Sequence, residues 1–123
     1  MNPVKAGFPS PAADYAEEGL DFNALLVKRK AATYCLRVSG DSMIEAGILP
    51  EDIIVVDRSL PPAQGDIVVA ALNGEFTVKR FFLRHRSVVL HPENSSYDDI
   101  TVGPEEDFRV FGVVTAVVRR YRH

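Results

Sequence analysis

One serine, Ser42, stands where an apolar run that favours a strand gives way to residues that favour a helical turn, in the sequence V-S-G-D-S-M-I-E. The spacing from Ser42 to Glu45 is that of a capping box, so the simplest interpretation is that the Ser42 hydroxyl caps a helix. The position also suits a nucleophile, because the backbone N–H groups of Ser42 and Met43 at a helix start can bind the oxyanion formed when a serine attacks a carbonyl. That chemistry needs a base.

Lys79 is the candidate base, because its predicted strand over residues 75–83 is apolar on both faces. With side chains alternating across the strand, Lys79 shares its face with Phe81 and Leu83. Such surroundings disfavour the charged amine and lower its pKa from about 10.4 toward the range in which the neutral form can take a proton. The alternative is an ordinary strand lysine whose amine reaches water.

The histidines and the cysteine are weaker candidates for chemistry. His91 and either Asp98 or Asp99 would complete a Ser-His-Asp triad on paper, but the aspartates follow Asn-Ser-Ser and are predicted to lie in a polar loop. The remaining histidines and the single cysteine have neither metal-ligand spacing nor a C-x-x-C partner; they are His85, His123 and Cys35. We therefore expect no metal and no cofactor.

Length and charge restrict the class of protein. The chain has 123 residues, of which 46% are hydrophobic, and this suffices for one domain with a buried core. Its formal net charge of −3 makes nucleic acid an unexpected direct partner. One cysteine fits a reducing compartment, and no apolar run approaches the roughly 20 residues of a membrane span. We expect a cytoplasmic protein without a membrane partner, whose basic end over residues 119–123 is a solvated tail.

The elements before the serine are an arm and short helices. Several prolines and a glycine in residues 1–12 predict an extended arm, with the folded domain over residues 13–123. A first helix is predicted from Ser10 to Gly19. A second helical turn is predicted after Asp21, with the lysines of residues 28–30 near its favourable C-terminal end.

The rest of the chain predicts strands and turns. Asn73-Gly74 is the strongest hairpin signal, and Gly47 is expected to end a helical turn that begins at Met43. The predicted strands cover residues 32–38, 52–57, 66–72, 75–83, 87–91 and 108–119. This pattern predicts a mostly β domain of antiparallel sheets, coiled or barrel-like, with short helices.

Three segments together resemble a known family: S-G-D-S-M at 39–43, G-D-I-V-V-A at 65–70 and F-T-V-K-R-F at 76–81. With 37 positions between Ser42 and Lys79, their order is similar to that of the self-cleaving Ser-Lys peptidases of the LexA and UmuD type, from about Ala6 to Val118. The resemblance implies that Ser42 is the nucleophile, that Lys79 is the general base, and that the backbone of Ser42 and Met43 forms the oxyanion hole.

The resemblance also implies a cleavage site. Family members cut their own arm between a small residue and glycine, and Ala6-Gly7 has this form. Six residues before Gly7 leave no room for the helix-turn-helix domain of LexA or phage repressors, so the chain is most similar to the UmuD branch, with an arm shorter than is usual there.

A UmuD-type protein implies a homodimeric accessory subunit of an error-prone translesion DNA polymerase, made in the SOS response to DNA damage. Its partners would be the polymerase catalytic subunit and a RecA filament that promotes cleavage. Two alternatives stay open from the residues alone. One is a non-catalytic β-barrel interaction module, and the other is a Ser-Lys peptidase that cuts other proteins, as signal peptidases do.

Overall fold

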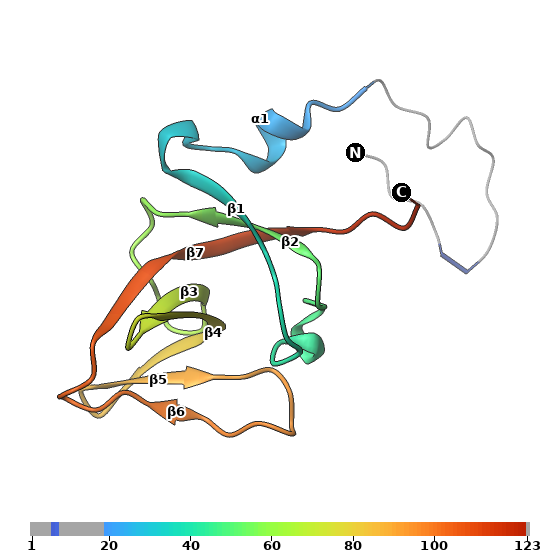
Figure 1. The fold of residues 1–123 in the computed structure, drawn as a ribbon. Helices are drawn as coiled ribbons and strands as arrows, with labels where there is room; N and C mark the ends of the chain where they lie inside the picture. The colour runs from blue at the N-terminus through green and yellow to red at the C-terminus, as the bar shows by residue number, and fades with distance from the viewer. Residues whose placement is uncertain (1–5, 8–18, 123) are drawn as a thin grey trace.

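The computed structural model describes residues 6–7 and 19–122, and in these residues the strands form one antiparallel sheet (Figure 1). The strand order is β1-β2-β7-β3-β4-β5-β6, which confirms the prediction of a mostly β fold. Each predicted strand is present within one residue of its expected bounds, whereas the two-residue β6 is too short to leave a sequence pattern. The strands are β1 (Thr33–Arg37), β2 (Ile53–Asp57), β3 (Ile67–Leu72), β4 (Glu75–Arg84), β5 (Ser87–His91), β6 (Ile100–Thr101) and β7 (Phe108–Val118).

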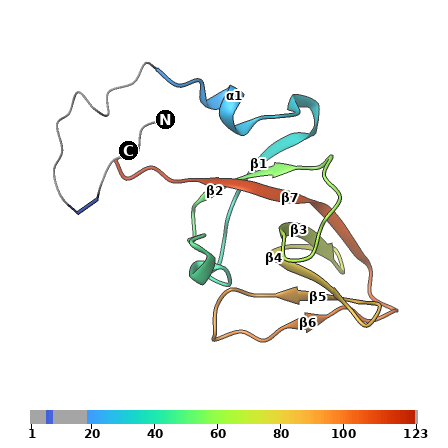
Figure 2. The same ribbon diagram turned by 180° about the vertical axis from the view of Figure 1, so that it is seen from behind.

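Strand β7 holds the sheet together and gives it its curl. Its C-terminal half pairs with β2 and its N-terminal half pairs with β3 (Figure 2). The register shifts at two places, leaving Thr115 and Phe111 as extra residues in β7, and such bulges bend a strand. A Cβ atom at position 112 would lie 2.6 Å from Val56 Cγ1, so Gly112 is needed for β7 to pass this close to β2.

The β3–β4 hairpin fixes the register of Lys79. Asn73 and Gly74 join the strands with φ of 51° and 86°, the left-handed pair of a two-residue hairpin turn, as the sequence predicted. The resulting register places Lys79 opposite Val68. Since a slip of one residue would move Lys79 to the other face of the sheet, this turn decides where the amine lies.

The helical elements are short. Helix α1 (Phe22–Leu26) begins at Asp21, whose side chain accepts hydrogen bonds from the N–H groups of Asn23 and Ala24, and this confirms the predicted helical turn. The basic residues 28–30 come directly after the C-cap Val27, near the end of the helix as predicted, and its last turn contains no basic residue. Two 3-10 turns follow, η2 (Lys30–Ala32) and η3 (Ile44–Ala46), and Gly47 ends η3 with φ of 82°. The helix predicted from Ser10 and most of the arm lie outside the described residues.

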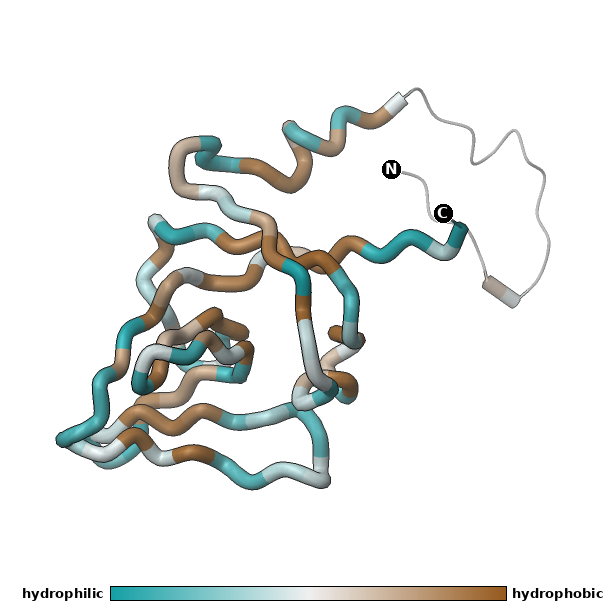
Figure 3. Tube along the Cα trace, in the orientation of Figure 1, coloured by the Kyte–Doolittle hydropathy of each residue, from teal (hydrophilic) through white to brown (hydrophobic). Residues whose placement is uncertain are grey.

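The apolar core divides into two clusters on the two faces of the sheet. Figure 3 shows the apolar residues recurring along the strands. The first cluster packs the η3 turn against β2 and β3, and Met43 lies at its centre with 2% of its surface exposed. The second cluster covers the other face around Val68, Ala70 and Phe81. Burial of Met43 therefore anchors the loop that carries Ser42.

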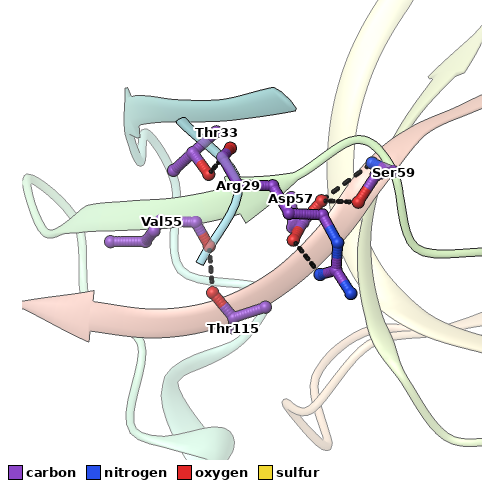
Figure 4. A network of polar contacts seen from close by, with 6 residues as sticks. All are labelled: Arg29, Thr33, Val55, Asp57, Ser59 and Thr115. Carbon is purple, nitrogen blue, oxygen red and sulfur yellow. Dashed lines mark hydrogen bonds and ion pairs between the residues drawn. The ribbon is translucent and has the colours of Figure 1, made fainter. Parts of the chain in front are cut away.

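A buried carboxylate joins the entry into β1 to the end of β2. Asp57 Oδ1 accepts hydrogen bonds from the hydroxyl and the N–H of Ser59, at 2.6 and 2.8 Å, and Asp57 Oδ2 accepts one from Arg29 at 3.1 Å (Figure 4). The Ser59 hydroxyl is the main cause that lowers the pKa of Asp57. Thr33 Oγ1 donates to the carbonyl of Arg29, so the segment after α1 is tied to the sheet.

The predicted solvated tail is wrong for its first residue. Arg119 forms a two-pronged ion pair with Asp52, with both N···O distances at 2.6 Å, and donates a further hydrogen bond to the Gly47 carbonyl. Asp52 is 2% exposed, and a buried carboxylate requires a cationic partner. The last strand is thereby fastened to the end of η3.

We predict that Arg119→Ala lowers the urea midpoint of unfolding at pH 7 and that the difference from the wild type narrows in acid. Hydrogen bonding to Arg119 holds the pKa of Asp52 below its usual 3.8, so the pair stabilises the fold above that pH and loses this effect as pH falls through the lowered pKa. Urea titrations at pH 7, 5 and 3 measure the difference, with the exposed Arg120→Ala as a control. A difference that is independent of pH would contradict this account.

Candidate active site

The structure brings Lys79 and Ser42 into contact. Lys79 Nζ donates a hydrogen bond to Ser42 Oγ at 3.0 Å, across 37 positions of sequence. Both side chains are partly buried in a pocket of about 180 Å³ between the loop after β1 and the first half of β4. A nucleophile and a base need this hydrogen-bond distance for proton transfer.

Thr77 completes the surroundings of the amine. Its Oγ1 accepts a hydrogen bond from Lys79 Nζ at 2.6 Å. Thr77 precedes Lys79 by two residues on the same strand, so the two side chains share a face. The two-residue spacing in the sequence already indicated that Thr77 and Lys79 share a face, although Thr77 was not among the predicted site residues. With two hydroxyl acceptors, the amine is held in one direction.

Burial sets the protonation behaviour of Lys79. Desolvation in the pocket lowers the pKa of Lys79 below its usual 10.5, as predicted from its apolar neighbours. Within the described residues, no carboxylate forms an ion pair with this amine that would oppose the shift. The neutral amine is therefore more accessible here than for a lysine in water.

The helix-cap interpretation of Ser42 is wrong. The residue before η3 is Met43, which makes no side-chain capping hydrogen bond, and Ser42 Oγ faces Lys79 instead. Glu45 also does not act as the partner of a capping box, because its carboxylate accepts a hydrogen bond from the N–H of Ser95. The Ser42 hydroxyl is thus directed into the pocket.

The backbone beside Ser42 offers donors for a developing negative charge. In the described part of the chain, neither the N–H of Ser42 nor that of Met43 donates a hydrogen bond. The first hydrogen bond of the turn runs from the N–H of Ile44 to the carbonyl of Asp41. The two preceding amides therefore remain available at the start of η3, where an oxyanion hole was predicted.

A loop distant in sequence holds the segment that carries Ser42. The loop after β5 lies beside η3 in both views of the ribbon (Figures 1 and 2). From it, Tyr97 Oη donates to Asp41 Oδ1 at 2.5 Å and Asn94 Nδ2 donates to the Asp41 carbonyl at 2.8 Å. The hydrogen bond that Tyr97 donates to the Asp41 carboxylate raises the pKa of Tyr97. Sequence analysis missed these residues, because nothing in the local pattern links positions more than 50 residues apart.

The other predicted chemical residues lie elsewhere. His91 Nδ1 pairs with Asp99 at 2.5 Å, but neither residue lines the pocket around Ser42, so the structure does not assemble the hypothetical triad. Cys35 is an exposed free thiol in β1. In residues 6–7 and 19–122, no group of His, Cys, Asp or Glu side chains could hold a metal ion. No helix within those ranges is long and apolar enough to cross a membrane.

The predicted cleavage site is exposed. Ala6 and Gly7 are both exposed, and neither lines the pocket that contains Ser42. The short segment is drawn away from the sheet in Figures 1 and 2. No atom lies within 4 Å of the position that a Gly7 side chain would take.

Comparison with known proteins gives a family match and close relatives. Residues 1–115 match the family described as Peptidase S24-like. The chain is 52% identical to Protein ImpA of Salmonella typhimurium over 96% of this chain and 80% of the relative. It is 44% identical to Protein MucA of Escherichia coli over 91% of this chain and 77% of that protein. A LexA repressor of Carboxydothermus hydrogenoformans is 42% identical over 96% of this chain and 57% of its own length.

We predict that Lys79 titrates below the value of about 10.4 that an unperturbed lysine has. Burial causes this shift, so it should persist in Ser42→Ala, which cannot use Ser42 Oγ as nucleophile or acceptor. Carbon-13 NMR of the lysine Cε groups measures the midpoint, and loss of one signal in Ser42→Ala/Lys79→Arg identifies Lys79. Equal midpoints for Lys79 in the folded protein and in urea would contradict the desolvated pocket.

Proposed function

This chain belongs to the Peptidase S24-like family, with UmuD-like relatives, and on that premise we propose that it is a self-cleaving serine peptidase with Ser42 as nucleophile and Lys79 as general base. The observation that carries the proposal is the 3.0 Å contact between Lys79 Nζ and Ser42 Oγ in a partly buried pocket. A lysine without a chemical role is most stable with its charged amine in water, so nothing favours its burial beside a serine hydroxyl.

The proposed cleavage begins with proton transfer. Neutral Lys79 takes the proton of Ser42 Oγ, and the oxygen attacks the carbonyl carbon of Ala6. The amides of Ser42 and Met43 bind the resulting oxyanion. When the tetrahedral intermediate collapses, the bond to Gly7 breaks and the Lys79 ammonium gives its proton to the leaving amine. Water, activated by neutral Lys79, then hydrolyses the ester between Ser42 and Ala6 and restores both side chains.

The substrate is an extended segment with small residues. Strand β5 pairs with β4 only from Arg80 to Arg84, so residues 75–79 of β4 keep an edge that no described strand pairs. This edge borders the pocket of Ser42, and an extended arm can add to such an edge as a strand. Ala6-Gly7 suits the site because small side chains let the backbone approach Ser42 closely. The arm that enters can come from the same chain or from a second copy.

The relatives support a proposal for the biological role. We infer that the cleaved form is an accessory subunit of an error-prone translesion DNA polymerase in the SOS response, and that a RecA filament promotes the cleavage. The UmuD-like relatives ImpA and MucA support this role, as does similarity to a LexA repressor. A homodimer in the cytoplasm, in complex with the polymerase catalytic subunit, is the form that this role requires.

We predict that the rate of spontaneous self-cleavage rises about tenfold per pH unit and levels off above the apparent pKa of Lys79. The rate rises with pH because only the neutral amine accepts the Ser42 proton. Since the pKa of Lys79 is lowered, the rate levels off at a lower pH than it would with an ordinary lysine. Intact mass spectrometry measures the rate and identifies a product that begins at Gly7.

Three variants test the same mechanism. Ser42→Ala and Lys79→Ala should not cleave, and Lys79→Arg should not cleave because a guanidinium keeps its proton in this range. Lys28→Arg, an exposed lysine away from the pocket, is the matched control and should cleave like the wild type. Cleavage by Lys79→Arg, or a rate that is flat from pH 7 to 10, would exclude Lys79 as the base. Loss of cleavage in all proteins, even with RecA filament, would favour a non-catalytic interaction module.

We predict a homodimer at roughly tens of micromolar, well above nanomolar to micromolar dimer constants. Exposed apolar side chains at the end of the last strand support it, since Val117 and Val118 are 42% and 37% exposed and Tyr121 is 93% exposed. Sedimentation or light scattering of Ser42→Ala measures the mass. A monomer at these concentrations would count against the UmuD-like role, without affecting the proposed chemistry.

A further inference from the structure

A second exposed feature joins aromatic and arginine side chains from distant parts of the chain. We define the aromatic-arginine patch as Tyr34 of β1, Arg58 after β2, Phe76 of β4, and Arg109 and Phe111 of β7. The rings of Tyr34 and Phe76 each lie 5.6 Å from the ring of Phe111, in edge-to-face arrangement. Phe76 is 68% exposed and Tyr34 is 43% exposed, so aromatic surface stays in contact with water.

Two features of the strands place these aromatic rings at the surface. Phe111 is the extra residue of the bulge between β3 and β7, and a bulge redirects a side chain. Phe76 stands opposite Ala71, a small neighbour that leaves the ring uncovered. Clustered exposed aromatic residues rimmed by charge are typical of interaction surfaces.

Arg58 is already oriented for binding. Its Nε donates to the Phe111 carbonyl at 3.1 Å, and its guanidinium carbon lies 4.3 Å from the centre of the Phe111 ring. These contacts fix the plane of the guanidinium group and leave its Nη atoms for a partner. An arginine held in this way loses little conformational freedom when it pairs with a carboxylate.

Neither arginine of the patch has a carboxylate partner in the described residues. Other arginines do, since Arg29, Arg80 and Arg119 each lie within 4.0 Å of an acidic side chain. The chain as a whole has more acidic than basic residues, 17 against 14, so these two unpaired cations are not explained by a shortage of carboxylates. Charge complementarity favours an acidic partner.

Between the two arginines lies a pocket of about 130 Å³. Arg58 and Arg109 flank it, and Phe76, Phe111, Ala71 and Val110 supply its apolar lining. A binding segment that places an apolar side chain on this lining brings neighbouring carboxylates beside the guanidinium groups. The pocket thus suits a peptide segment in which acidic residues flank an apolar residue.

We propose that the aromatic-arginine patch is a docking surface for an acidic segment of a partner protein that carries a bulky apolar side chain between carboxylates. The apolar side chain packs against Phe76 and Phe111, and the carboxylates pair with Arg58 and Arg109. A nucleic-acid strand is a poorer fit, because the face of Arg58 already stacks on Phe111 and the chain carries net negative charge. Phe76 also lines the pocket of Ser42, so the docked segment reaches the border of the candidate active site.

The test measures binding in Ser42→Ala, so it does not depend on self-cleavage. The probe is a fluorescein-labelled peptide, acetyl-Glu-Asp-Phe-Asp-Glu-amide, followed by fluorescence anisotropy. We expect saturable binding that weakens with added salt, and weaker binding of the peptides that carry glycine for phenylalanine or lysine for the acidic residues. Arg58→Glu/Arg109→Glu should weaken binding of the acidic peptide by about tenfold or more and should strengthen binding of the lysine peptide.

Two controls keep the outcome decisive. Arg120→Glu makes the same charge change at an exposed arginine outside the patch, and it should bind like the parent protein. Arg109→Glu alone leaves the Arg58 contact to Phe111 in place and should by itself weaken binding of the acidic peptide, so the test stands even where the double variant does not fold. Equal binding by all variants would overturn the proposal. Tighter binding of a single-stranded oligonucleotide of about 12 nucleotides, lost in the same variants, would overturn it in favour of nucleic acid.

Discussion

The contact between Lys79 and Ser42 depends on two parts of the chain that fold by different rules. Lys79 is positioned by hairpin register, which the Asn73-Gly74 turn fixes and which the pairing of β3 with β4 extends. Ser42 is positioned by packing, because its neighbour Met43 is buried in the core below. A 3.0 Å hydrogen bond requires both to be correct together. The rest of the sheet can thus be understood as the frame that keeps a strand and a loop in a fixed relation.

Strand alternation separates Lys79 from a neighbouring ion pair. Arg80, the next residue, points to the other face of β4, where its Nε pairs with Glu93 at 2.6 Å. The backbone carbonyl of Glu93 accepts a hydrogen bond from the N–H of Glu45 in η3. If a carboxylate stood next to Lys79 in the same way, it would favour the charged amine and oppose base chemistry. Strand β4 therefore carries Arg80, which requires a carboxylate partner, directly beside Lys79, whose lowered pKa requires that no carboxylate is near.

Sequence analysis succeeded where the controlling interactions are local. Alternation and turn residues identified six of the seven strands to within one residue, the Asn73-Gly74 turn, and the direction in which burial shifts the pKa of Lys79. Local patterns did not reveal contacts between distant positions, and the pairing of Ser42 with Lys79 came from the family resemblance. The Ser42-to-Glu45 spacing predicted a cap, but Glu45 binds the backbone of Ser95, 50 residues away. Arg119 was expected to be solvated, yet Asp52 needs it 67 positions away. Pattern cannot show which buried carboxylate a distant arginine will neutralise.

Phe76 connects the candidate active site to the aromatic-arginine patch. The residue lines both pockets, and it lies on the part of β4 that β5 leaves unpaired. The unpaired edge leaves backbone N–H and C=O groups free to pair with another strand, and the uncovered ring leaves apolar surface in water. The open strand beside Ser42 agrees with the proposed entry of the arm as a strand, and the exposed ring beyond it agrees with the proposed docking of a partner protein next to that arm.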